Sequence, residues 1–110
     1  MIIATRVLKL RQANGDVLIS VRIFAPERAE IDWSCQIEID WPDGTVTGAA
    51  TGVDAVQALD LALKMVGAQN YASDHHRSGR LEWLHPREGY GFPVPNNMRD
   101  MLIGDDKRYL

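Results

Sequence analysis

The sequence has only one cysteine in 110 residues, Cys35, so it can form neither an internal disulfide nor a cysteine-only zinc site. It also has no uninterrupted apolar run near the roughly 18 residues that cross a bilayer. Its apolar start is interrupted by Arg6 and Lys9, which is unlike the order of a secretory signal peptide. These absences predict a reduced, cytoplasmic setting, which we take to be bacterial.

An excess of positive charge is also missing, because 12 Lys and Arg stand against 15 Asp and Glu, for a net charge of -3. The cations Arg6, Lys9, Arg11 and Arg22 would form only a modest basic patch, without the aromatic signature of an RNA-binding domain. We therefore expect neither nucleic acid nor a membrane as a partner. The length suits one domain over residues 1–110.

No spacing of metal ligands or catalytic residues is present. His75 and His76 are adjacent, and adjacent imidazoles diverge along a helix or strand instead of meeting at one ion. Gly89-Tyr90-Gly91 lacks the third glycine of a dinucleotide-binding loop, because Val94 stands in that place. Cys35 alternates in register with apolar residues and is expected in the core. We therefore predict no catalytic residue, no metal and no cofactor, and regard an enzymatic function as uncertain.

Period-two alternation of apolar and polar residues predicts a series of antiparallel strands. Asn14-Gly15 is a strong hairpin signal, and Pro42-Asp43-Gly44 has the residues of a second tight turn. The polar segment 25–32, which contains a proline, is expected to be a loop. The predicted strands are residues 3–11, 17–24, 33–41 and 45–51.

A long helix follows, because Asp54 and Gln57 have the spacing of a capping box. It should run to about Ala72. Its apolar arc is wider than one contact with a sheet requires, since Leu61 and Met65 form a second apolar side. Either the C-terminal segment or another subunit should cover that side.

The C-terminal part of the chain is expected to contain only short elements. Residues 81–84 are typical of a short strand, and the prolines in 91–95 require an extended segment. A short helix over 97–103 and a frayed tail over 105–110 complete the chain. The expected fold class is α+β: a four-stranded antiparallel meander with one long helix packed on it, then a short strand and a short C-terminal helix.

The order of several segments resembles a family of small uncharacterised bacterial proteins, a domain of unknown function found mainly in proteobacteria. The segments that carry the resemblance are Trp33-Ser34-Cys35, Asp40-Trp41-Pro42, 52–59, 79–83 and 91–95. The resemblance spans about residues 17–104. It implies a stand-alone cytoplasmic domain, and it implies no activity, cofactor or catalytic residue.

The leading functional hypothesis is a non-enzymatic protein-interaction module that forms a homodimer. It follows from the wide apolar arc of the helix and from tryptophans that can anchor an interface. The candidate interface residues are Leu61, Met65, Trp83 and Phe92.

Two alternatives remain open. The first is a small enzyme or ligand-binding domain with a pocket between the sheet and the 89–95 segment; its candidate residues are Glu38, His75, His76 and Tyr90. The second is an immunity-type or regulatory inhibitor that blocks one cognate protein with an acidic face. The residues of that face are Asp32, Glu38, Asp40 and Asp43.

Overall fold

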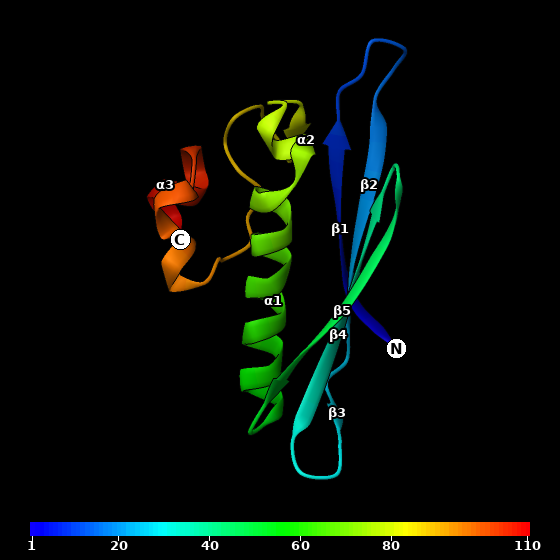
Figure 1. Cartoon of the computed structure of the whole chain (residues 1–110), viewed down its shortest axis with the longest axis vertical. Helices are drawn as coiled ribbons and strands as arrows, with labels where there is room; N and C mark the ends of the chain where they lie inside the picture. Colours follow the sequence, from blue (N-terminus) through cyan, green and yellow to red (C-terminus); the bar gives the residue numbers. More distant parts are fainter.

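The computed structural model describes all 110 residues and consists of an antiparallel sheet with one long helix across one of its faces (Figure 1). No helix covers the opposite face of the sheet. This arrangement confirms the predicted α+β fold. The elements are β1 (Ile2–Leu10), β2 (Val17–Phe24), β3 (Glu27–Arg28), β4 (Trp33–Trp41), β5 (Gly44–Gly52), α1 (Ala55–Ala72), α2 (Asp74–Arg77), β6 (Leu81–Glu82), the 3-10 helix η1 (Asn96–Met101) and α3 (Gly104–Tyr109).

The sheet is the predicted meander with two short additions. Strands β1, β2, β4 and β5 lie side by side in that order, and β6 pairs with the end of β1 at Lys9 and Leu10. The expected loop over 25–32 contains β3, which pairs with the start of β4. The loop prediction was wrong at this point because a tight turn, closed by the Ala29 N–H donating to the Asp32 carbonyl, brings Glu27 and Arg28 back alongside β4.

The core lies between the sheet and α1. Alternate strand residues point toward the helix, as the period-two pattern requires. The helix presents mainly small side chains to them, so its axis can approach the sheet closely. The fully buried residues of this layer are Leu8, Ile19, Val21, Cys35, Ile37, Ile39, Ala58, Ala62 and Val66.

The start of α1 is fixed by reciprocal side-chain caps. The Asp54 carboxylate accepts a hydrogen bond from the Gln57 N–H at 2.8 Å, and the Gln57 side chain accepts one from the Val53 N–H at 2.7 Å. Gly52 lets β5 run directly into this turn, because a Cβ there would lie 2.5 Å from the backbone nitrogen of Ala58. The predicted capping box is therefore present and sets the angle between β5 and α1.

The chain's own C-terminal segment covers much of the second apolar side of α1. Gly67 lies directly against the carbonyl of Pro93, and a Cβ at that position would overlap it. Phe92, Val94 and Leu102 are buried there. α3 lies on the far side of α1 from the sheet (Figure 1), where Tyr71 reaches it. Leu61 stays 39% exposed, so the coverage is incomplete.

The C-terminus is more ordered than the sequence predicts. The expected helix over 97–103 is the 3-10 helix η1, and the expected frayed tail forms α3. The difference has a physical cause. Asp106 is only 3% exposed and accepts three hydrogen bonds, so residues after 104 are fixed by a polar contact that no hydrophobic pattern reveals.

Candidate functional site

The free edge of β5 is the most open part of the fold. β5 pairs only with β4, and Trp41 pairs with Gly44 across the Pro42–Asp43 turn. Because pairing alternates from that closing pair, every second residue directs its N–H and C=O away from the sheet. These outward residues are Thr45, Thr47, Ala49 and Thr51. The strand contains no charged residue and no proline, which are the usual protections of an exposed edge.

An apolar hollow runs beside this edge on the helix side. α1 packs across β4 and β5, and Met65 rests on Gly48, with its sulfur 2.9 Å from where a Cβ would be. Leu61 lies one turn earlier on the same side of the helix and is partly exposed. The hollow has a volume of about 490 Å³ and is lined by Ala50, Leu61, Lys64, Met65, Pro95 and Asn96. Two predicted interface residues, Leu61 and Met65, therefore lie beside an unpaired strand edge.

The uncovered face of the sheet carries an ionic cluster. The Arg22 guanidinium donates to Glu38 at 2.9 Å and to both oxygens of Asp40 at 2.6 and 2.8 Å. Hydrogen bonds from Arg22 and Thr45 lower the pKa of Asp40 to about 2. The same two carboxylates raise the pKa of Arg22, with Asp40 contributing most. Glu38 thus lies in an ion-paired cluster of one cation and two carboxylates, apart from the other predicted ligand residues.

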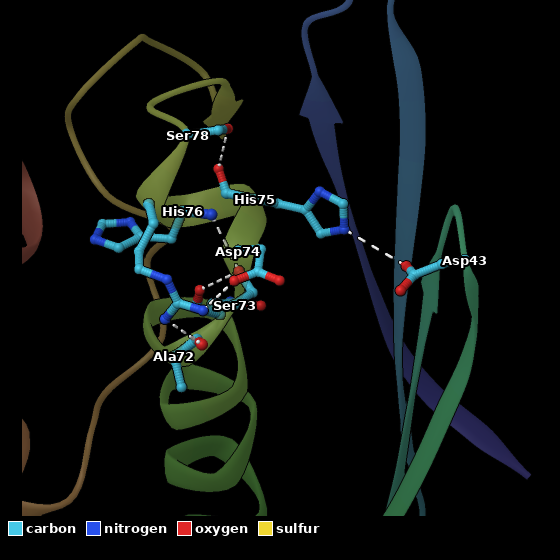
Figure 2. Close-up of polar contacts among 9 residues, drawn as sticks. Asp43, Ala72, Ser73, Asp74, His75, His76 and Ser78 are labelled. Atoms are coloured by element: carbon cyan, nitrogen blue, oxygen red, sulfur yellow. Dashed lines mark hydrogen bonds and ion pairs between the residues drawn. The ribbon is translucent and has the colours of Figure 1, made fainter.

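The two adjacent histidines point to opposite sides of α2 (Figure 2). His75 faces the sheet, where its ring stacks on Trp41 with centroids 5.1 Å apart and its Nε2 lies 3.6 Å from an Asp43 oxygen. A hollow of about 250 Å³ opens there between α2 and the β4–β5 turn. The structure therefore separates His75 from His76.

His76 belongs to an aromatic cluster under the C-terminal segment. Its Nδ1 lies 2.5 Å from the Tyr90 hydroxyl, and both rings pack edge-on against Tyr71. Burial, and then the nearby Arg77, lower the pKa of His76, while burial raises the pKa of Tyr90. A neutral imidazole thus shares a hydrogen bond with a protonated phenol. Two of the predicted ligand residues, His76 and Tyr90, are in contact, but in a packed cluster.

Asp106 joins this cluster to the C-terminal helix. Its carboxylate accepts hydrogen bonds from the Tyr71 hydroxyl at 2.6 Å and from the backbone N–H groups of Tyr90 and Gly91 at 2.8 Å each. Burial, followed by the hydrogen bond to Asp106, raises the pKa of Tyr71. Sequence reasoning missed Asp106. The only signal was the Gly89-Tyr90-Gly91 pattern, since both glycines adopt positive φ and Gly89 lies against the carboxylate.

Arg6 connects β1 to the same loop from the other side. Its guanidinium donates to the carbonyl oxygens of Tyr90 and Gly91 at 3.1 and 3.0 Å. It lies 3.8 Å from the ring centroid of Trp83 and 4.6 Å from that of Phe92. Burial lowers its pKa, against the attraction of Asp106. The predicted interface residues Trp83 and Phe92 thus pack around an internal cation, and Phe92 is only 5% exposed.

The remaining candidate nucleophile, Cys35, is a residue of the core. Cys35 is fully buried, its thiol donates to the Phe24 carbonyl at 3.2 Å, and burial raises its pKa, all of which oppose formation of a thiolate. Nowhere do three His, Cys, Asp or Glu side chains gather as a metal site would require. None of the helices combines the length and hydropathy needed to cross a bilayer.

Comparison with known proteins identifies a family but indicates no function. A family model described as a domain of unknown function, DUF6968, matches residues 4–94. No curated protein and no solved structure matches the chain significantly. The matched range contains the sheet except for the first two residues of β1, together with α1, α2 and the Gly89–Gly91 loop, and it ends before η1 and α3. The chain therefore belongs to the family of domains of unknown function DUF6968.

Proposed function

We propose that the domain is a non-enzymatic interaction module that forms a homodimer through the free edge of β5. The observation that carries this proposal is a nine-residue edge strand that has no charge and no proline, with a partly exposed apolar helix side next to it. Edges of this kind pair with another strand, because half of their backbone donors and acceptors otherwise face only water.

The sequence of β5 favours a second copy of itself as the pairing strand. In an antiparallel pair with a two-fold axis at Gly48, Thr45 lies opposite Thr51 of the other copy, and Thr47 lies opposite Ala49. All four have outward backbone groups, so the pairing completes hydrogen bonds on both strands. The side chains that meet are small and neutral, and opposed threonines are a favourable cross-strand combination. The same patch therefore complements itself, as a two-fold dimer requires.

The helix side of the same edge supplies the apolar part of the interface. When two copies pair through β5 they form one continuous sheet, and both α1 helices lie on the same face of that sheet. Leu61 and the hollow lined by Met65 and Pro95 then face the symmetry axis. Burial of Leu61 from its present 39% exposure adds hydrophobic stabilisation to the strand pairing.

Sedimentation equilibrium of two variants at one position tests the proposal. Thr47→Pro removes an outward N–H and places a ring at the paired edge, and prolines are tolerated on such edges. Thr47→Val keeps the N–H and a β-branched side chain. We expect the wild-type protein and Thr47→Val to sediment as dimers and Thr47→Pro as a folded monomer. A wild-type protein that is monomeric at every concentration, or a dimeric Thr47→Pro, contradicts the proposal.

The ligand-binding alternative has one specific observation in its favour. A hollow of about 140 Å³ lies between the sheet and Phe92, with Arg6 and Thr5 in an otherwise apolar lining. Such a lining suits a small amphiphilic anion. A thermal-shift screen of short carboxylic acids tests this alternative, and a shift abolished by Arg6→Met supports it. The acidic-face hypothesis has less support, because Glu38 and Asp40 are both paired with Arg22, which offsets one of their two negative charges.

A further inference from the structure

The C-terminal arm, defined as residues 95–110, is attached to the rest of the molecule mainly through Leu102 and Asp106. It lies outside the range of the family match, residues 4–94. Leu102 and Asp106 are its only buried side chains. Its backbone adds two long hydrogen bonds of 3.3 Å, from Ile103 to the Tyr71 hydroxyl and from Asp106 to the Glu88 carbonyl. Met98, Ile103 and Leu110 pack against the core from outside and stay partly exposed, so the arm lies on the surface formed by the rest of the chain.

The surface beneath Asp106 is shaped for a carboxylate. Adjacent backbone N–H groups of Tyr90 and Gly91 each take one carboxylate oxygen, and the Tyr71 hydroxyl is a third donor. Gly89 makes room, because a side chain there would overlap the carboxylate. All of these donors belong to the range matched by the family, whereas the acceptor belongs to the arm.

Positive charge behind the loop strengthens this surface. Arg6 donates to the carbonyl groups of Tyr90 and Gly91, while the N–H groups of the same two residues face Asp106. The Tyr90 carbonyl and the Gly91 N–H belong to one peptide group, so a cation on the carbonyl side polarises that group and makes the Gly91 N–H a better donor to an anion. The surface beneath Asp106 should therefore bind a negatively charged group better than a neutral one.

We propose that Tyr71, Tyr90 and Gly91 form a receptor for the carboxylate of an acidic peptide, and that the arm occupies this receptor in cis. The peptide class follows from the arm itself: Leu102 precedes Asp106 by four residues, so the receptor takes an apolar side chain four positions before a carboxylate. An acidic peptide in trans binds when the arm opens. This surface is separate from the β5 edge, so the proposal does not depend on the homodimer.

Binding of a labelled synthetic peptide of residues 95–110 tests the receptor. The two full-length proteins compared are Asp106→Asn and the matched neighbour Asp105→Asn, whose carboxylate is partly exposed. Because an occupied site lowers apparent affinity in proportion to its open fraction, Asp106→Asn should bind the peptide at least about tenfold tighter than Asp105→Asn. A peptide that itself carries Asp106→Asn should bind at least about tenfold more weakly. Equal affinities in either comparison would overturn the proposal.

Hydrogen exchange on the unmodified protein gives a test that needs no variant. The Tyr90 and Gly91 amides should exchange through local opening of the arm, faster than core amides such as that of Ile37. An excess of the native peptide should slow them, and the Asp106→Asn peptide should not. Exchange of these two amides only by global unfolding would show that the arm is a permanent part of the core, and would overturn the proposal.

Discussion

The two edges of the sheet differ in how far other segments of the chain cover them. Along the C-terminal half of β1, the segment after α2 covers the edge: β6 pairs with Lys9 and Leu10, the Arg11 N–H donates to the Arg80 carbonyl, and Arg6 donates to the carbonyls of Tyr90 and Gly91. Along β5 nothing comparable happens, although the strand has nine residues and no charge.

The difference indicates which edge of the sheet is covered by the chain itself and which edge is free to pair with another strand. The C-terminal half of the β1 edge is covered through cation–π contacts and backbone hydrogen bonds, so changes there should act on folding stability. The β5 edge makes no contacts with the rest of the chain on its outer side, so changes there should act on association and leave the fold intact. The predictions below test each half of this contrast.

The largest effect is expected at Gly91, where the covering loop meets β1. Gly91 has positive φ, and a Cβ there would overlap the Trp83 ring and the Arg6 guanidinium. Gly91→Ala should lower the free energy of unfolding by about 3 kcal/mol, from backbone strain and overpacking together. Gly79→Ala is the matched control, because Gly79 also has positive φ but open space around it, and should cost about 1 kcal/mol. Equal losses in urea denaturation would mean that the loop is not packed on β1.

A smaller effect is expected from removing the Arg6 charge. Arg6→Met keeps the apolar stem between Trp83 and Phe92 but leaves two carbonyls without their donor, so we expect a loss of about 2 kcal/mol. Arg80→Met, on the same side of the sheet at an exposed position, should change stability by less than about 0.5 kcal/mol. Thermal unfolding of both variants measures the difference.

Lowering the pH should decrease the free energy of unfolding through protonation of His76. Its pKa is lowered by burial and by Arg77, so the folded state binds its proton less readily than the unfolded state. This contribution to stability is fully present above the unfolded pKa of about 6.5 and is lost as pH falls toward the folded pKa. We expect His76→Asn to flatten the decline of the unfolding free energy between about pH 7.5 and 5, and an unchanged decline would contradict this prediction.

The smallest effect on folding is expected at the open edge. Leu61→Glu should change the free energy of unfolding of the monomer by less than about 0.5 kcal/mol, because the side chain is already partly exposed. It should nevertheless weaken the homodimer, since a charge would be buried at its axis. Val56→Glu, at 76% exposure on another side of α1, is the control and should leave association unchanged. Dilution series by light scattering distinguish the two variants.

Sequence patterns predicted the parts of the fold in which the conformation of a residue depends on its near neighbours in the chain. Alternation in β4, the turn at Pro42-Asp43 and the Asp54–Gln57 cap all predicted the structure correctly, because periodicity and capping are local. They also located Leu61 and Met65 on a second helix side. The short strand β3 was missed because its pairing depends on a tight turn inside a polar segment.

The polar contacts of the C-terminal part could not be predicted in this way. Asp106 lies among exposed charged residues in the sequence, and its burial depends on N–H groups 15 and 16 residues away. Arg6 reaches across more than 80 residues to the same loop. Both contacts require the folded loop with its glycines at positive φ, and no local pattern encodes such a pairing.

Amide hydrogen exchange of β5 at low and high protein concentration tests the central claim most directly. The account predicts that the outward amides of Thr45, Thr47, Ala49 and Thr51 exchange freely in dilute protein and become protected at high concentration, while amides that face β4 stay protected in both. Outward amides that exchange freely at every concentration, in a protein whose β4-facing amides remain protected, would contradict it.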